Sequence, residues 1–270
     1  MTQYFLIIGA MKAGTSSLYH DLGNLDGVFM TPEKEPDDLA SEEVLTEAGT
    51  KAYLAKFSGA RSGDICGEAS TSYSKLPMIN GVPERAVKVL GKNLKIIYVQ
   101  RDPIARIISQ YKHVWGLGLE TRPMNRAVLE DPSYIAISQY EYQLEAWRKS
   151  LPTDQILILE FEEYIANPGD VLSKVATFLE VDAPEHVSST HRNASDNKHV
   201  VPRNSVLFTV MSSRLYQYSI KPLIGSSMVD FIKSKVLPKP KVTDETLSEA
   251  TLQTLTERLN NSTGEPSSHS

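Results

Sequence analysis

The residues with the clearest potential for chemistry lie near the start of the chain. Gly9, Lys12, Gly14 and Thr15 form the pattern G-x-x-K-x-G-T, directly after the apolar run at residues 4–8. Glycines allow backbone N–H groups to close around an anion, and the N-terminus of a following helix adds a partial positive charge. The pattern therefore predicts a phosphate-binding loop between a strand and a helix. The residues expected to contact the anion are Lys12, Ala13, Gly14, Thr15 and Ser16.

The position of the lysine separates this loop from the ordinary nucleoside-triphosphate loop. That loop reads G-x-x-x-x-G-K-[ST], with the lysine directly after the second glycine. Here Thr15 takes that position and Lys12 lies inside the loop, so the usual hydroxyl ligand for Mg²⁺ has no standard place. The heptad resembles the 5′-phosphosulfate loop of the sulfotransferases that use 3′-phosphoadenosine 5′-phosphosulfate (PAPS). For this motif alone, a strand–helix connection that binds nothing is the alternative.

A second candidate anion site follows the apolar run at residues 95–100. The next residues read R-D-P-I-A-R-I-I-S-Q-Y, where Pro103 is typical of a first helical turn and Asp102 of an N-cap. The segment resembles the 3′-phosphate motif of sulfotransferases, R-[DN]-P-x-x-R-x-x-S-x-Y. That resemblance implies that Arg101 and Ser109 hold the 3′-phosphate of PAPS. The alternative is an ion pair between Arg101 and Asp102, with Ser109 facing solvent.

The candidate general base is Glu35, in the polar segment T-P-E-K-E-P at residues 31–36. An alcohol is a poor nucleophile, and a carboxylate within reach can accept its proton as a new bond forms. Sulfotransferases that act on sugar hydroxyls and amines carry a K-E-x-x-F-F-like loop here, and the similarity implies this role for Glu35. Asp37, Asp38 and Leu39 replace the aromatic pair, which predicts an altered acceptor pocket. A solvated charged loop is the alternative.

Glu68 and Tyr73 are further candidates for the acceptor side. They belong to G-E-A-S-T-S-Y at residues 67–73, which resembles the family segment G-E-x-[ST]-P-x-Y with Thr71 in place of the proline. The resemblance implies that Glu68 orients Lys12 or contacts the acceptor, and that Tyr73 lines the pocket. Glu68 also remains an alternative base. A turn rich in N-cap residues is the other interpretation.

Lys198 and Arg203 lie in a basic part of an otherwise acidic chain. The net charge is −5, yet residues 198–241 contain eight Lys or Arg and one acid. In related sulfotransferases a Gly- and Lys-containing loop at this point closes over the adenine and the 3′-phosphate, and the resemblance implies that role for both residues. The segment lacks the glycines, so a solvated basic face is the alternative.

The hydrophobic pattern predicts an α/β fold with a doubly wound, mostly parallel central sheet and helices on both faces. The resemblance adds that this is the P-loop-like sulfotransferase fold. Strands are expected at residues 4–8, 64–68, 95–100 and 155–161, and helices at 104–115, 134–147 and 171–179. With 270 residues and 41% hydrophobic content, a single domain over residues 1–260 is expected, with a disordered polar tail at 261–270.

Composition limits the class of partner and the compartment. The negative net charge disfavours nucleic acid as a partner. Cys66 is the only cysteine, which predicts a reducing compartment and hence a cytoplasmic protein. The apolar run at residues 4–8 is too short for a signal peptide or a membrane span.

Over residues 4–205, four motifs in family order resemble PAPS-dependent sulfotransferases of the carbohydrate, heparan and bacterial types. This implies in-line transfer of a sulfuryl group from PAPS to a hydroxyl or amine of a glycan, lipid or small molecule. Lys12 would stabilise the leaving phosphate, Glu35 would act as base, PAP would be the product, and no metal would be required. Two alternatives stay open. One is a P-loop small-molecule kinase, supported by Glu160 after a strand; the other is a non-catalytic nucleotide- or glycan-binding protein on the same scaffold.

Overall fold

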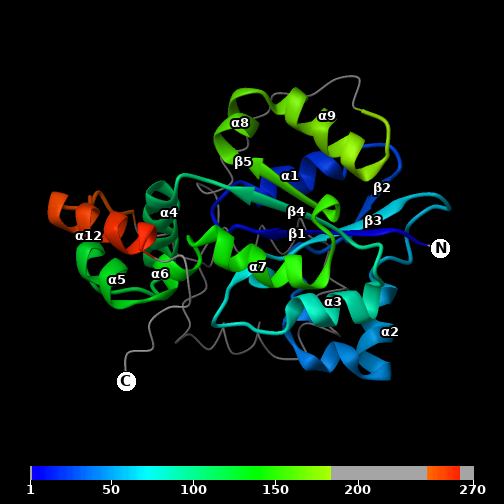
Figure 1. The fold of residues 1–270 in the computed structure, drawn as a ribbon, viewed down its shortest axis with the longest axis horizontal. Coiled ribbons are helices and arrows are strands. Elements are labelled where there is room, and N and C mark those ends of the chain that lie inside the picture. The colour runs from blue at the N-terminus through cyan, green and yellow to red at the C-terminus, as the bar shows by residue number, and fades with distance from the viewer. Residues whose placement is uncertain (1, 184–241, 262–270) are drawn as a thin grey trace, which may run out of the picture.

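The computed structural model describes residues 2–183 and 242–261, and its centre is a sheet of five strands in the order β2-β3-β1-β4-β5 (Figure 1). Every neighbouring pair in the sheet is parallel. The strands are β1 (Tyr4–Gly9), β2 (Val28–Met30), β3 (Ile65–Ala69), β4 (Lys95–Gln100) and β5 (Ile156–Glu160). The predicted parallel α/β fold is confirmed, and β2 is a strand that the sequence pattern did not predict.

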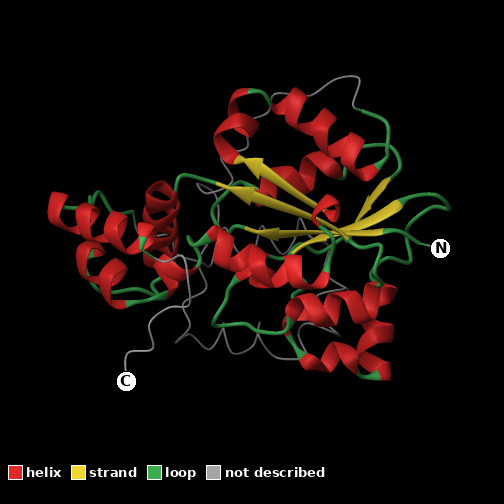
Figure 2. Cartoon of the chain, in the orientation of Figure 1, coloured by secondary structure: helices red, strands yellow, loops and turns green. Residues whose placement is uncertain are grey.

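Helices cover both faces of the sheet (Figure 2). In Figure 1, α1, α8 and α9 lie above the sheet, and α7, α3 and α2 lie below it. The helices are α1 (Thr15–Leu22), α2 (Glu47–Ala55), α3 (Val82–Leu90), α4 (Pro103–Gly116), α5 (Met124–Glu130), α6 (Ser133–Ala136), α7 (Tyr140–Ser150), α8 (Phe161–Ala166), α9 (Pro168–Leu179) and α12 (Glu249–Asn260). Short 3₁₀ turns are η1 (Asp38–Ala40), η2 (Glu42–Leu45), η3 (Thr71–Ser74) and η4 (Thr153–Gln155).

One predicted helix is wrong in its extent. The stretch 134–147 is expected as one helix, but the chain forms α6 and α7 with a break between them. Gln139 at the break has φ −85° and ψ 76°, which is not helical. The apolar spacing continues across the break because both helices bury side chains, among them Tyr134 and Trp147. Periodicity alone therefore did not reveal the change of direction.

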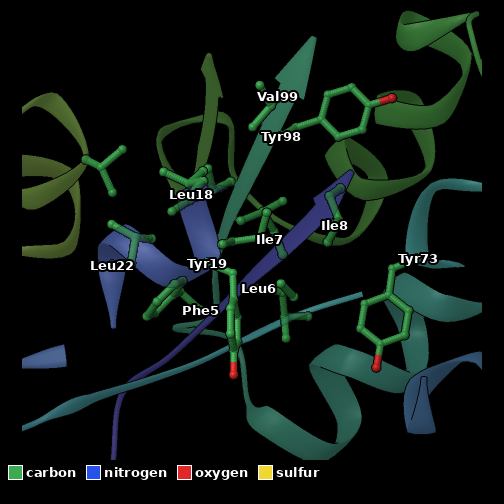
Figure 3. Close-up of a cluster of buried hydrophobic side chains, with 14 of the residues drawn as sticks. Phe5, Leu6, Ile7, Ile8, Leu18, Tyr19, Leu22, Tyr73, Tyr98 and Val99 are labelled. Carbon is green, nitrogen blue, oxygen red and sulfur yellow. The ribbon is translucent and has the colours of Figure 1, made fainter. Parts of the chain in front are cut away.

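The apolar runs of β1 and β4 lie in the middle of the sheet, where both faces are covered. Phe5 to Ile8 and Ile96 to Val99 are completely buried (Figure 3). Leu18 and Leu22 of α1 add to the same core. Close packing also explains Gly67 in β3, since a Cβ at this position would lie 2.1 Å from the Phe5 ring.

The chain order of the strands places two loops side by side at the carboxyl edge of the sheet. From β1 the chain first builds β2 and β3 on one side, and then crosses to β4 and β5 on the other. The loops after β1 and β4 therefore flank the position where the direction of winding reverses, which is where open α/β sheets bind ligands. Next to this edge, α4, α5, α6 and α12 pack around a second apolar cluster that includes Ile107, Tyr111 and Leu255.

Candidate active site

The loop between β1 and α1 has the geometry of an anion cradle. Lys12 and Gly14 adopt left-handed φ angles of 71° and 84°, which turn the backbone sharply before the helix. A side chain at Gly14 would also collide with Phe161, 2.8 Å from the added Cβ. The first helical amides to bond within α1 are those of Ser17 and Leu18, both to the Gly14 carbonyl. The amides of Gly14, Thr15 and Ser16 thus precede the helical hydrogen bonds and can face an anion, whereas the Ala13 amide donates to the Ala10 carbonyl at 3.1 Å.

Arg101 joins the two predicted anion sites. Its Nη1 donates a hydrogen bond of 3.0 Å to the Lys12 carbonyl, and its guanidinium lies 4.6 Å from the centre of the Phe161 ring. The Nε atom is buried without a hydrogen-bond partner in the part of the chain that the structure describes. A buried donor without a partner is costly unless a ligand satisfies it. Arg101 is therefore fixed beside the loop with a donor left for an anion.

Asp102 begins α4 and is not the ion-pair partner of Arg101. Its Oδ1 accepts a hydrogen bond of 2.7 Å from the Ala105 amide, which confirms the predicted N-cap. The Tyr140 hydroxyl donates to the Arg101 carbonyl at 2.7 Å and so fixes the backbone just before the helix. The alternative in which Arg101 pairs with Asp102 is therefore wrong.

The second arginine of the motif, Arg106, does not face the loop. It is fully buried and donates to Ser138 Oγ, Gln110 Oε1 and the Tyr134 carbonyl, at 2.5, 2.7 and 2.7 Å. Burial lowers the pKa of Arg106 to about 10, so it remains charged at neutral pH. Arg106 thus ties α4 to the segment around α6, whereas the partly exposed Ser109 lies one turn further along α4.

The segment after β2 carries the candidate base at the carboxyl edge of the sheet. The Glu35 amide donates 2.8 Å to the Ala69 carbonyl at the end of β3. Its side chain is 45% exposed and lies 2.6 Å from Lys34 Nζ. Thr71 Oγ1 is 3.4 Å from the same carboxylate oxygen. Glu35 is therefore accessible and oriented by neighbours.

Lys75 is a cation that interacts with the segment carrying Glu35, and the sequence motifs did not single it out. Burial lowers the pKa of Lys75, while the carboxylates of Glu35 and Asp37 act in the opposite direction by favouring the charged ammonium. The carboxylates that favour the charged form of Lys75 thus belong to the same segment as the candidate base. A cation here offsets part of their negative charge.

The predicted acceptor contacts of Glu68 and Tyr73 need correction. Glu68 is completely buried, and Tyr73 is 3% exposed. The Glu68 carboxylate accepts hydrogen bonds from Tyr53, Tyr73 and Ser70, at 2.8, 2.7 and 3.1 Å. Neither side chain is open to a bound acceptor, because tertiary packing encloses the end of β3. The sequence showed the polar pattern but could not show its burial.

Burial of Glu68 leads to a testable effect of pH on stability. Burial raises the pKa of Glu68 from 4.5 to about 7, although the three hydroxyls oppose the rise. A folded-state pKa above the unfolded value stabilises the fold at low pH, and this stabilisation is lost as the pH rises through about 7. The difference in unfolding free energy between wild type and Glu68→Gln should therefore shrink by roughly 3 kcal/mol between pH 5 and pH 8. Denaturant unfolding at both pH values measures it, and a constant difference would contradict the shift.

Known proteins with similar sequences are sulfotransferases. Residues 69–201 match the family model described as "Sulfotransferase domain". Heparan sulfate glucosamine 3-O-sulfotransferase 5 from mouse is 29% identical over 187 residues, and the human 3-O-sulfotransferase 3B1 is 26% identical over the same length. These similarities support the PAPS-dependent sulfotransferase family for this chain.

Each of these two alignments covers 64% of this chain. The chain spans only about half of the length of these relatives, 52% of the mouse protein and 45% of the human one. A sulfotransferase from Alicyclobacillus acidocaldarius has a similar fold, with a TM-score of 0.62 and 24% identity over 71% of this chain and 86% of its own. The sulfotransferase domain from the curacin biosynthetic pathway reaches a TM-score of 0.55 at 15% identity, covering 96% of this chain and 98% of that domain. A mouse sulfotransferase in complex with PAP has a TM-score of 0.50 at 15% identity, covering 97% and 85%. These structures share the sulfotransferase fold.

Within this sulfotransferase fold, the structure brings Lys12, Arg101 and the first amides of α1 together at one edge of the sheet. Lys198 and Arg203 lie outside the described residues, so their donor contacts stay predictions. Across residues 2–183 and 242–261 no group of three or more acidic, His or Cys side chains is arranged to hold a metal ion. No helix in the same ranges combines the length and apolarity needed to cross a membrane.

Proposed function

We propose that this protein transfers a sulfuryl group from PAPS to a hydroxyl or amine acceptor. The observation that supports this best is the contact between Arg101 and the Lys12 carbonyl, with the buried Arg101 Nε left unsatisfied. PAPS carries phosphate groups at both its 5′ and 3′ positions, so one can bind the Lys12 loop while the other binds Arg101. The heparan sulfate 3-O-sulfotransferases in the family, and the relative bound to PAP, support the same donor.

In this proposal the anion cradle holds the 5′-phosphosulfate end of the donor. Lys12 and the amides of Gly14, Thr15 and Ser16 contact the phosphate, with Ala13 completing the turn. Arg101 and Ser109 contact the 3′-phosphate, and Lys198 and Arg203 close over the nucleotide. ATP carries no 3′-phosphate, so the arginine selects PAPS over ATP.

The transfer is a single in-line displacement. The acceptor oxygen or nitrogen forms a bond to sulfur while the bond from sulfur to the 5′-phosphate oxygen of the donor breaks. The acceptor proton moves to Glu35, the electron pair of the broken bond stays on the phosphate, and PAP leaves. By analogy with phosphoryl transfer, the protein contributes mainly positioning and charge stabilisation. The scheme requires no metal ion.

Binding of PAP is the experiment that tests the donor assignment. Calorimetric titration of the full chain with PAP, ADP and ATP plus Mg²⁺ separates the open alternatives. We expect micromolar or tighter binding of PAP, with at least about tenfold preference over ADP, which would correspond to about 1.4 kcal/mol. A preference for ATP with Mg²⁺ would favour a kinase. Tight PAP binding without transfer from labelled PAPS to any hydroxyl or amine tested would favour a binding protein.

Glu35→Gln tests the general base. The change keeps the size of the side chain and removes its ability to take a proton, so we expect transfer from labelled PAPS to fall by about 10²- to 10⁴-fold. The affinity for PAP should change less than threefold, because Glu35 lies on the acceptor side. Glu33→Gln is the matched control, since Glu33 is exposed two residues earlier in the same segment. Equal activity of the two variants would assign the base to another residue.

A further inference from the structure

The segment that carries Glu35 and Asp37, here called the acceptor loop (residues 35–39), is fixed at alternate backbone amides. Each of three amides donates to a different oxygen of the segment that begins at the end of β3. The bonds run from Glu35 N to the Ala69 carbonyl at 2.8 Å, from Asp37 N to Ser70 Oγ at 3.2 Å, and from Leu39 N to Tyr73 OH at 3.3 Å. Two of the three acceptors are hydroxyls, which can rotate and can also donate.

The direction of these two hydroxyls is set by one carboxylate. Ser70 Oγ donates to Glu68 Oε2 at 3.1 Å, and Tyr73 OH donates to Glu68 Oε1 at 2.7 Å. Because each hydrogen points to Glu68, each hydroxyl oxygen offers its lone pairs to a loop amide. Figure 3 shows Tyr73 among the core side chains, and Glu68 itself is completely buried. The carboxylate therefore acts on the acceptor loop through two relays and does not touch it.

The acceptor loop needs such support because its backbone is strained. Glu35 and Asp37 have φ angles of 57° and 58°, in the left-handed region that non-glycine residues rarely adopt. Conformations of this kind cost on the order of 1 kcal/mol each and persist when the surroundings fix them. The Asp37 carboxylate adds a bond of 2.5 Å from Ser72 Oγ, also from the segment after β3. The position of Glu35 thus depends on this segment.

We propose that Glu68 is a positioning residue that holds the acceptor loop, and with it Glu35, by orienting the hydroxyls of Ser70 and Tyr73. The proposal rests on the proposed function in naming Glu35 as the base, but the structural relay can be tested without an acceptor. Glutamine cannot replace Glu68 fully, because its NH₂ group donates where a hydroxyl also donates. If the NH₂ group takes the position of Oε2, the Ser70 hydroxyl can no longer donate to residue 68, and if it takes that of Oε1, the Tyr73 hydroxyl cannot. That hydroxyl then accepts from the NH₂ group and turns its hydrogen away, which weakens its bond to the loop amide.

Tyr53 provides a matched control within the same cluster. Its hydroxyl donates to Glu68 at 2.8 Å, as that of Tyr73 does, and both rings are buried. Among the described residues the Tyr53 hydroxyl donates its hydrogen bond to Glu68 and forms none with the acceptor loop, so Tyr53→Phe removes a bond to the carboxylate and leaves both relays intact. Tyr73→Phe removes the bond to the same carboxylate and the acceptor of the Leu39 amide. Comparison of the two variants separates positioning from general stabilisation.

The test is amide hydrogen exchange followed by NMR at pH 8 on the full chain and on four variants, Glu68→Gln, Ser70→Ala, Tyr73→Phe and Tyr53→Phe. We expect exchange at Asp37 to accelerate at least tenfold in Ser70→Ala, and exchange at Leu39 at least tenfold in Tyr73→Phe. Glu68→Gln should accelerate at least one of the two at least tenfold, and Tyr53→Phe neither by more than threefold. The amide of Ile97 in β4 reports global unfolding and corrects each variant for lost stability. If Glu68→Gln does not fold, the three hydroxyl variants carry the test.

Equal acceleration in Tyr53→Phe and Tyr73→Phe, or unchanged exchange at Asp37 and Leu39, would overturn the proposal. The affinity for PAP, measured in parallel, should stay within threefold of wild type in all four variants, because the relays lie on the acceptor side. A parallel loss of PAP affinity would also contradict a role confined to that side. Failure of the wild-type protein to bind PAP would refute the proposed function alone, since the exchange pattern does not depend on the donor.

Discussion

Replacement of Lys12 by methionine is expected to reduce sulfuryl transfer by about 10²- to 10³-fold, equivalent to about 3–4 kcal/mol. In the proposed mechanism negative charge grows on the 5′-phosphate as the bond to sulfur breaks, and Lys12 supplies a full positive charge beside it. Methionine keeps the unbranched apolar part of the lysine side chain, so the substitution adds no steric conflict with the left-handed backbone at residue 12. Single-turnover transfer from labelled PAPS measures the effect on chemistry apart from product release.

The matched control for Lys12→Met is Lys51→Met, which removes an exposed lysine from α2. It changes the net charge of the protein by the same amount and should leave transfer unchanged. Turnover within threefold of wild type in Lys12→Met would contradict the role of Lys12 at the leaving phosphate. A loss confined to PAP affinity, with unchanged single-turnover rate, would make Lys12 a binding residue only.

Replacement of Arg101 by methionine is expected to weaken PAP binding by about 30-fold or more, or about 2 kcal/mol, and AMP binding by less than threefold. The difference between the two nucleotides isolates the 3′-phosphate, because AMP lacks it. The partly buried guanidinium already donates to the Lys12 carbonyl, so in this proposal the side chain loses little further conformational freedom when the 3′-phosphate binds. Calorimetric titration of both nucleotides measures the effect.

Arg101→Met also removes the bond to the Lys12 carbonyl, so a loss common to PAP and AMP reports damage to the loop. Arg101→Lys separates the two effects, since lysine keeps the charge but not the two-pronged geometry of the guanidinium. Arg148→Met is the control for net charge, because Arg148 lies in α7 and pairs with Glu141. Equal losses for PAP and AMP in Arg101→Met would contradict a 3′-phosphate contact.

Local patterns in the sequence were sufficient to place the anion cradle and the start of α4. The apolar runs of β1 and β4 are nearly continuous, as is typical of strands covered on both faces. The first run is followed by the glycines of the loop, and the second by the helix-starting residues Asp102 and Pro103. Asp102 and Pro103 begin a helix in the structure as their types predict. These features depend on neighbours within a few residues, so the sequence alone carries them.

The sequence did not predict the role of a side chain where that role depends on residues far away in the chain. Arg106 shares a motif with Arg101, yet it ends in a buried network with Ser138 and Gln110 and faces away from the loop. Two arginines five residues apart look equivalent in the sequence. Only the packing of α4 against α6 distinguishes the one that can meet a ligand from the one that joins two helices.

By itself, then, the sequence determined a parallel α/β fold, the loop built around Lys12 and the helix start at Asp102, because glycine, proline and capping residues constrain the backbone locally. The tertiary structure decided which polar residues are accessible. Glu35 and Glu68 are both acids near the ends of strands, but one is 45% exposed and the other fully buried. Burial is decided by residues such as Tyr53 and Tyr73 that converge from different elements, and no local pattern encodes that convergence.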